Sequence, residues 1–366
     1  MAPRRPRVDH RLGRHLPRSL KRVGVSRLRI WLDMANSPHP VLLGPVAQEL
    51  EARGHEVFVT TRDHAQTRDL TMAIWPEAMI VGGESPGTRG AKTRAIAGRV
   101  IGLRRAVASL KPDRAVSLGS YAQIVAARIL GVKVVTLMDY EYQPANHLSF
   151  RLAHTVVVPS VFPQERLRKY GASARRVARF DGFKEELYLD GPIAAPESVA
   201  VPDGGTLAVF RPPPEGALYH QQGNSDFDTV LEYAVSRNDV HVVVLPRMAE
   251  QQLRYAEMEG VQVPDRAVDG LALLRSADVF IGAGGTMSRE AALLGARSYT
   301  MFAGRLAAVD ADLIERGLLK DLRGHEPSTV DWCPRARDQA DLALRQRQER
   351  GRELRAWLVD RIEEAA

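Results

Sequence analysis

One stretch of the chain joins glycines, a helix start and a carboxylate in an order that suits phosphate binding. Residues 278–294 read DVFIGAGGTMSREAALL. The apolar run 279–281 predicts a buried strand, 282–286 a tight turn and 288–294 a helix. Small residues let the backbone of the turn approach a ligand, and free amides at a helix start favour an anion. Glu290, one turn into this helix, is placed to accept hydrogen bonds from a ribose. The alternative is a tight strand-to-helix connection whose glycines serve geometry alone.

Polar side chains also follow the first predicted strand, in the loop ANSPHP at 35–40. The His39 imidazole can take the proton of an acceptor hydroxyl near neutral pH, as a general base does. A helix cap or a surface group is the alternative for this histidine. Asn36 and Ser37 offer donors to an acceptor or a phosphate, and they could equally cap the helix that follows.

Two arginines come at the ends of strands predicted in the second half of the chain. Arg211 follows 207–210, and Arg247 follows 241–245. The carboxyl ends of parallel strands face a ligand crevice, and the planar guanidinium matches phosphate geometry. We therefore expect both arginines to contact an anion, with a surface role as the alternative.

Acidic pairs occur at two places. Asp139 and Glu141, in MDYEY, follow a predicted strand, and they either orient sugar hydroxyls, act as acid or base, or only end a turn. Asp310 and Asp312 have a spacing that can bind a divalent metal, but the helical pattern LIERGLL follows them, so helix capping explains them better. No other cluster of His, Cys or carboxylates has ligand spacing, so we expect no metal and no cofactor.

Strands and helices alternate along the chain in two successive halves. The segment 190–205 is rich in proline, glycine and small residues, which is typical of a linker. The pattern predicts an α/β fold with two doubly wound domains, 28–189 and 206–366, that face each other across a cleft. Predicted strands lie at 28–34, 55–61, 79–81, 114–118, 133–137, 155–158, 207–210, 241–245, 279–281 and 298–302, and predicted helices at 40–53, 93–110, 121–130, 227–236, 250–258, 270–275, 288–294 and from 335 to the end.

Bulk properties restrict the class of protein. With 45% hydrophobic and 26% charged residues, the composition is that of a soluble globular protein, and no apolar run is long enough to cross a bilayer. Cys333 is the only cysteine, which excludes an internal disulfide, and the start lacks the apolar segment of a secretory signal. We therefore expect a cytoplasmic protein.

The net charge of +7 belongs to the start of the chain. Residues 1–27 hold nine Lys and Arg against one acid, Asp9, whereas the rest of the chain has 42 basic and 43 acidic residues. We expect this basic tail to be disordered. Attraction to an anionic membrane surface, which would place the protein at the inner membrane face, is the alternative, and nucleic acid is not expected as a partner.

These features together resemble the GT-B superfamily, which contains nucleotide-sugar glycosyltransferases and the UDP-N-acetylglucosamine 2-epimerases. The segments WLDMANSPHP, VTTRDHAQT and GGTMSREAALLG look specifically like a bacterial and archaeal family of unknown function with a DMANSPH-type opening. The resemblance covers about 28–319 and leaves the basic tail outside. It implies a GT-B fold, in which two Rossmann-like domains face each other across a cleft, with the acceptor bound by the first domain and the donor by the second.

The resemblance also implies roles for individual residues. The turn at Gly284, Gly285 and Thr286, with Met287 beside it, would hold the donor diphosphate through backbone amides, and Glu290 would bind the ribose hydroxyls. The loop at Val268 and Asp269 would pack against the nucleotide base, with an ordinary turn before a helix as the alternative.

The resemblance implies a metal-independent glycosyltransferase that moves a sugar from a nucleoside-diphosphate donor to an acceptor that the sequence does not identify, with a glycan or a lipid-linked glycan as candidates. We expect acceptor contacts in the loops of the first domain, around 82–94, where GGESPGTRGAKTR is basic. A 2-epimerase is the alternative, but such enzymes carry an aspartate where SLGSYAQ offers Ser120, and a histidine-arginine pair where this chain has FRPPP. A non-catalytic module that binds nucleotide sugars is the third possibility.

Overall fold

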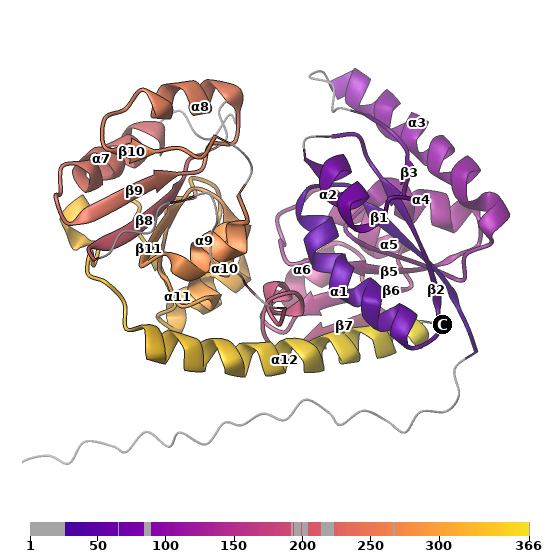
Figure 1. Ribbon diagram of the computed structural model, residues 1–366. Helices are drawn as coiled ribbons and strands as arrows, with labels where there is room; N and C mark the ends of the chain where they lie inside the picture. The colour runs from indigo at the N-terminus through magenta and orange to yellow at the C-terminus, as the bar shows by residue number, and fades with distance from the viewer. Residues whose placement is uncertain are drawn as a thin grey trace, which may run out of the picture.

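The computed structural model has two domains, each built around a parallel sheet (Figure 1). It describes residues 26–64, 66–83, 89–191, 193, 199, 204–213, 223–265 and 268–365. The first sheet has the strand order β3-β2-β1-β4-β5-β6-β7, and the second has the order β10-β9-β8-β11-β12-β13. In each sheet the order reverses between two central strands, β1 and β4 or β8 and β11, which is the usual ligand position in doubly wound folds. The predicted fold class of two Rossmann-like domains is confirmed.

The first domain alternates strands and helices with few interruptions. Its elements are β1 (Arg29–Met34), α1 (Pro38–Ala52), β2 (Glu56–Thr61), α2 (Thr67–Ile74), β3 (Met79–Ile80), α3 (Arg89–Val107), η1 (Ala108–Leu110), β4 (Arg114–Leu118), α4 (Tyr121–Ile129), β5 (Lys133–Leu137), α5 (Asn146–Leu152), β6 (Thr155–Pro159), α6 (Gln164–Lys169), η2 (Ala174–Arg176), β7 (Val177–Phe180) and η3 (Lys184–Leu187).

The second domain repeats this arrangement. Its elements are β8 (Thr206–Arg211), α7 (Gly223–Val235), β9 (Val240–Val244), α8 (Ala249–Ala256), β10 (Val261–Gln262), α9 (Gly270–Ser276), β11 (Val279–Gly282), α10 (Gly285–Leu293), β12 (Arg297–Thr300), α11 (Ala308–Glu315), β13 (Leu319–Asp321), η4 (Pro327–Thr329) and α12 (Arg337–Glu363).

Both sheets are buried because helices cover their two faces. Strand β1 reads RIWLDM, and every residue after Arg29 is buried, including the polar Asp33. Such continuous apolar runs are expected of central parallel strands, which have no solvent-facing side. The runs predicted at 114–118 and 133–137 coincide with β4 and β5 for the same reason.

The last helix, α12, runs beneath both domains (Figure 1). The sequence assigned 206–366 to the second domain, yet the final turns of α12 lie on the first. There Arg53 Nη1 donates to Asp360 Oδ1 at 2.6 Å, and His55 Nε2 lies 2.9 Å from Glu363 Oε1. Leu358 and Ile362, four residues apart, are buried on the same side of the helix. The end of the chain therefore holds the two domains together.

Some predicted features fall outside the described residues. The tail at 1–25, most of the linker and residues 84–88 of the expected acceptor loop belong to this group. Within the part of the chain that the structure describes, no helix combines the length and apolar character that crossing a bilayer requires.

Candidate functional site

The glycine turn lies at the centre of the second domain. Strand β11 ends at Gly282, beside β8, and α10 begins at Gly285, three residues before the predicted start. Gly284 is the N-cap residue in an extended conformation. The first N–H groups of any α-helix have no acceptor within the helix, so the amides of 285–287 are available to a ligand.

Two arginines stand at this turn, as the sequence predicted from their positions after strands. Arg211, the last residue of β8, donates through Nη1 to the carbonyls of Leu245 and Pro246 at 2.8 and 2.6 Å. Arg247 Nε donates to the Pro212 carbonyl at 2.8 Å. The Nη2 of Arg247 lies so close to Gly284 that a Cβ atom there would be 2.5 Å from it. Glycine is therefore required for the guanidinium to approach the turn.

Neither of these two guanidinium groups forms an ion pair with a described carboxylate, although the charge of Glu290 acts on Arg211. Burial, and then the positive charge of Arg247, lower the pKa of Arg211 to about 10. Among the described residues, neither arginine has an ion-pair partner, and Arg211 Nε is buried without a hydrogen bond. Adjacent cations beside a helix N-terminus attract an anion, and guanidinium suits phosphate best.

Glu290 lies in the second turn of α10, behind the glycines. Its Oε1 accepts a hydrogen bond of 2.6 Å from the hydroxyl of Tyr188, which follows η3. Burial raises the pKa of Glu290 to about 7 and keeps Tyr188 protonated by raising its pKa well above the ordinary value. One carboxyl oxygen is thus engaged by the protein, and the other has no partner among the described residues.

The residues expected at the nucleotide base take positions at the start of α9. Asp269 is the N-cap residue, and its Oδ1 accepts from the N–H groups of Leu271 and Ala272 at 3.0 and 3.1 Å. Val268 is partly buried against the core. These contacts match the helix-start alternative, and contact with a base stays a prediction.

His39 belongs to the first turn of α1 rather than to a loop, which corrects the predicted helix start at residue 40. The helix begins earlier because Pro38 at its first position needs no amide hydrogen and has a suitable φ. His39 is 2% exposed. Its Nδ1 lies 3.2 Å from the Ala35 nitrogen and 3.4 Å from the Asp33 carbonyl oxygen, and the tautomer of the ring decides whether Nδ1 accepts from the first or donates to the second. Burial lowers the pKa of His39 to about 4, so the imidazole is neutral near pH 7.

The two polar residues before His39 do not cap α1 with their side chains. Ser37 is the N-cap residue but makes no side-chain cap hydrogen bond, and its Oγ lies 3.3 Å from Thr67 Oγ1. Asn36 is exposed, and its carbonyl accepts from the His39 N–H at 3.0 Å. Both residues lie at the carboxyl end of β1, so their predicted contact with an acceptor or phosphate stays a prediction.

Asp139 and Glu141 make contacts between the two domains. The Asp139 carboxylate accepts from Arg289 Nη1 at 2.5 Å and lies 2.8 Å from Lys184 Nζ. Burial alone would raise the pKa of Asp139, but the charges of Lys184 and Arg289 lower it to about 2. Glu141 Oε1 accepts from the N–H of Ala308, at the start of α11, at 2.9 Å. A part in catalysis stays a prediction for both carboxylates.

We call the buried charges around Arg289 the interdomain ion cluster. It consists of Asp139, Lys184 and Glu185 from the first domain and Arg289 and Asp310 from the second. The sequence did not single out Lys184, Glu185, Arg289 or Tyr188. The only available signal was that Arg289 immediately precedes Glu290, because no periodicity marks a contact between residues 150 positions apart.

Asp310 and Asp312 differ in environment. The Asp310 carboxylate accepts from the N–H of Ala307, the N-cap residue of α11, and from Arg289. Asp312 pairs with Arg316 one turn later. The expectation of capping therefore holds for Asp310, but it is wrong for Asp312, which lies inside α11 because that helix already begins at Ala308. In the described ranges, no group of three or more His, Cys, Asp or Glu is arranged to hold a metal ion.

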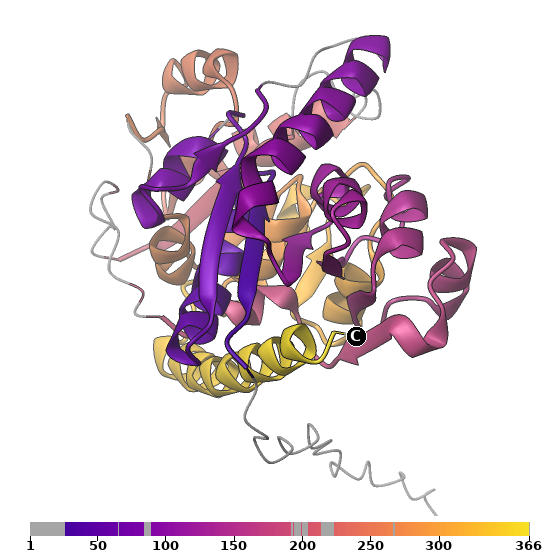
Figure 2. The same cartoon turned by 90° about the vertical axis from the view of Figure 1, so that its right-hand side faces the viewer.

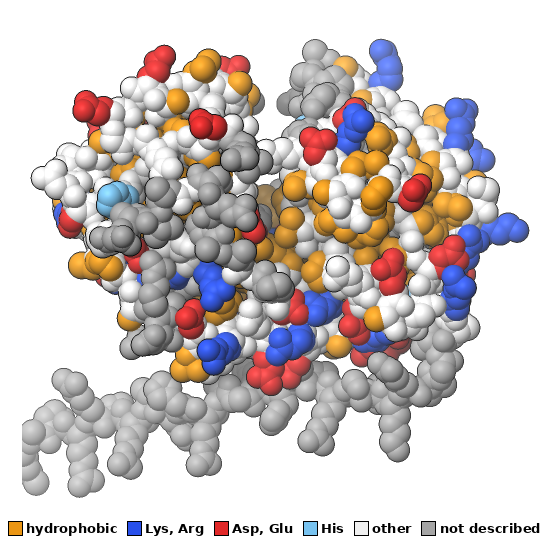
Figure 3. Space-filling model, viewed as in Figure 1, with side chains coloured by type: hydrophobic (Ala, Val, Ile, Leu, Met, Phe, Trp, Pro, Cys, Tyr) orange, Lys and Arg blue, Asp and Glu red, His pale blue; other side chains and the backbone are white. Residues whose placement is uncertain are grey.

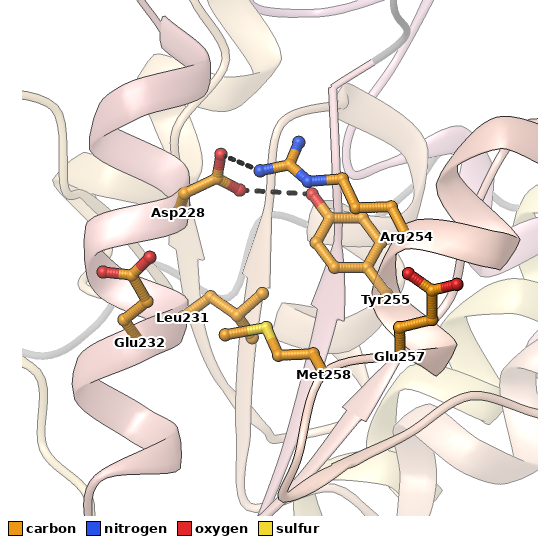
Figure 4. Close-up of a pocket in the computed structure, with 7 residues that line it drawn as sticks. All are labelled: Asp228, Leu231, Glu232, Arg254, Tyr255, Glu257 and Met258. Atoms are coloured by element: carbon orange, nitrogen blue, oxygen red, sulfur yellow. Dashed lines mark hydrogen bonds and ion pairs between the residues drawn. The ribbon is translucent and has the colours of Figure 1, made fainter.

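A cavity of about 250 Å³ lies elsewhere, between α7 and α8 (Figure 4). Asp228 crosses it to accept from Arg254 Nη2 at 2.5 Å and from the Tyr255 hydroxyl at 3.3 Å. None of the predicted site residues lines this cavity. Its polar groups pair with one another, so the candidate site is the glycine turn with its two arginines.

The fold of this protein occurs in several proteins of known structure. Two Rossmann-like domains in this arrangement are shared with GT-B proteins of known structure. A solved structure of the glycotransferase of kitacinnamycin has a TM-score of 0.58 and 19% identity, covering 93% of this chain and 99% of that one. A UDP-GlcNAc 2-epimerase of Methanocaldococcus jannaschii, solved with UDP-GlcNAc and UDP, has a TM-score of 0.62 and 12% identity, covering 87% and 99%. At these identities the likeness establishes the fold.

The chain belongs to the family described as "Protein of unknown function (DUF354)", whose model matches residues 28–324. An uncharacterised protein of Methanocaldococcus jannaschii is 29% identical over 301 residues, which is 79% of this chain and 86% of that protein.

Proposed function

We propose that this protein is a glycosyltransferase that moves a sugar from a nucleoside-diphosphate donor to an acceptor hydroxyl without a metal ion. The observation that carries the proposal is the pair Arg211 and Arg247 at the glycine turn before α10, neither of which forms an ion pair with a described carboxylate. Departure of a nucleoside diphosphate develops negative charge on its phosphates. Preorganised cations and helix-terminal amides stabilise that charge at little reorganisation cost.

The other site residues have assigned roles in this proposal. Glu290 accepts hydrogen bonds from the ribose, and Tyr188 orients its carboxyl group. His39 is the general base. This role requires the tautomer that carries its hydrogen on Nδ1, where it donates to the Asp33 carbonyl, because Nε2 then has the lone pair that accepts a proton from the acceptor. The lowered pKa of His39 keeps the imidazole in the unprotonated form that a base requires.

A nucleotide-sugar 2-epimerase is the second candidate, supported by the shared fold of the UDP-GlcNAc 2-epimerase. Two observations count against it. Ser120, at the position where such enzymes carry an aspartate, donates its hydroxyl to Asp33 at 2.5 Å within the buried interior. Arg211 is followed by prolines and has no histidine beside it. A non-catalytic nucleotide-sugar-binding module is the third candidate.

Incubation with UDP-, GDP-, ADP- and dTDP-sugars separates these functions. Release of the nucleoside diphosphate, by transfer to an acceptor or by slow hydrolysis, is expected for the glycosyltransferase. An isomerised sugar nucleotide would indicate the epimerase. Binding measured by calorimetry without any turnover would indicate the module.

Variants at the turn test the site itself. Arg247→Ala should weaken binding of nucleoside diphosphates about tenfold or more, because a guanidinium–phosphate contact is lost. Arg237→Ala is the matched control, since Arg237 is a partly exposed arginine of the same domain that pairs with Asp239 instead. Unchanged binding in Arg247→Ala would refute the phosphate site.

His39→Asn should leave binding of the nucleoside diphosphate unchanged and reduce turnover by about 10²–10⁴.

A further inference from the structure

Exposed large hydrophobic side chains are concentrated at one edge of the first domain. Half of those in the described ranges lie on α2, β3 and α3. The five residues, which we call the edge patch, are Leu70 (37% exposed), Ile74 (44%), Ile80 (44%), Ile96 (37%) and Ile101 (47%). Figure 2 looks toward this edge, where α2 and α3 flank the short strand β3. Helix α2 packs with α1 in one core cluster and α3 packs in the other, so Ile96 and Ile101 belong to a different surface from Leu70 and Ile74.

All charged side chains of helix α3 are positive. Its sequence, RGAKTRAIAGRVIGLRRAV, contains no Asp or Glu. Ile101 lies three and four residues before the exposed Arg104 and Arg105, so the three side chains share one face of the helix. Leu103 and Val107, on the opposite face of α3, are buried in the core. The outward face of α3 is therefore apolar at its centre and cationic at its rim.

The first half of α3 projects from the domain. Residues 93–98 are all exposed, so this segment has no buried side even though it includes Ile96. Figure 1 shows these first turns rising above the rest of the first domain. In Figure 3, hydrophobic side chains gather over α1 and α2, and Lys and Arg side chains follow the outer edge where α3 lies.

We propose that the outward face of α3, with Ile96 and Ile101, docks on an anionic lipid bilayer. The isoleucine side chains insert at the headgroup boundary, and the arginines attract acidic headgroups. The α2 side carries both signs of charge, with Arg68 paired to Asp63 at 3.6 Å and with the exposed Asp69 and Glu77. We therefore place α3, rather than α2, against the headgroups. This inference does not depend on the proposed reaction.

The test is co-sedimentation of the full chain with vesicles of phosphatidylcholine and phosphatidylglycerol at 70:30, compared with pure phosphatidylcholine. The wild type should bind the anionic vesicles only, and less at high salt. Ile101→Asp and the double variant Arg104→Glu with Arg105→Glu should each lower the partition coefficient on the order of tenfold. All of these side chains are exposed, so the fold should be retained, and a thermal melt checks this.

Leu253→Asp is the matched control, because Leu253 on α8 is 69% exposed and lies in the other domain. This variant should bind vesicles as the wild type does. The basic tail is present in every variant. If the tail carried the binding, all variants would bind the anionic vesicles equally, and this result would overturn the proposal. Failure of the wild type to bind anionic vesicles would also overturn it. A dimer in solution that Ile101→Asp converts to a monomer would assign the patch to a second copy of the chain instead.

Discussion

Buried carboxylates of this protein differ in charge because of their neighbours. Asp139 and Glu290 both lie in the region between the domains. Two cations beside Asp139 outweigh its burial and hold its pKa at about 2, whereas burial dominates at Glu290 and raises its pKa to about 7. The first group is a permanent anion that binds the domains together. The second can change its charge near neutral pH, which suits a ligand-binding group better than a structural one.

The pKa of Glu290 predicts a pH-dependent stability. Because its folded-state pKa of about 7 lies above the ordinary value of 4.5, this group stabilises the fold fully below pH 4.5. That contribution is lost as the pH rises to about 7. Relative to the wild type, Glu290→Gln should therefore gain on the order of 1–3 kcal/mol in unfolding free energy between pH 4.5 and 8.

Denaturant unfolding of both proteins at several pH values measures this gain. Glu250→Gln, at an exposed position on α8, is the control and should follow the wild type throughout. A constant difference between Glu290→Gln and the wild type at all pH values would contradict the raised pKa.

At the scale of elements, two helical glycines differ in the space available for a side chain. A Cβ at Gly98 in α3 would meet no atom within 4 Å, whereas a Cβ at Gly351 in α12 would stand 2.2 Å from the Glu186 carbonyl oxygen. Gly351 therefore allows α12 to pack closely against η3. Gly98 contributes no such contact, and it retains the usual entropic disadvantage of glycine in a helix.

This contrast predicts opposite effects of the same substitution. Gly98→Ala should stabilise the protein by about 0.5–1 kcal/mol. Gly351→Ala should destabilise it by about 1–3 kcal/mol, since backbone must move to admit the methyl group. Unfolding midpoints in urea measure both effects, and equal shifts of the two variants would show that α12 does not pack on η3 in this way.

At the scale of the whole molecule, the two domains are joined by α12 and by the interdomain ion cluster. Arg289 is central, because its guanidinium reaches Asp139 in the first domain and Asp310 in the second. It also follows the glycine turn directly. The orientation of the two domains is therefore tied to the helix that forms the candidate phosphate site.

Removal of the Arg289 side chain should lower the free energy of unfolding. Arg289→Met leaves the buried Asp310 without its cation and Asp139 with Lys184 alone, and loss of one partner from such a cluster destabilises a protein by about 3–5 kcal/mol. Unfolding free energy is the measurement, and small-angle scattering should show a changed separation of the domains. Arg237→Met, which removes the surface pair with the exposed Asp239, should do neither. A small loss of stability in Arg289→Met would mean that the cluster does not hold the domains.

The sequence alone determined the two-domain α/β architecture. Central parallel strands are buried on both faces, so β4, β5 and β11 appear as apolar runs between helical patterns, and the glycine turn with Arg211 and Arg247 follows from the positions of strand ends. These features are local, because each depends on residues close together in the chain.

The tertiary structure decided which polar groups meet. Arg289 pairs with Asp139, Tyr188 with Glu290 and Glu363 with His55, and each pair joins segments more than 100 residues apart. No local pattern encodes such contacts, since they arise only when the domains and α12 pack. The same packing placed the expected catalytic Asp139 and Glu141 at the domain interface, and it left the edge patch of α2, β3 and α3 uncovered.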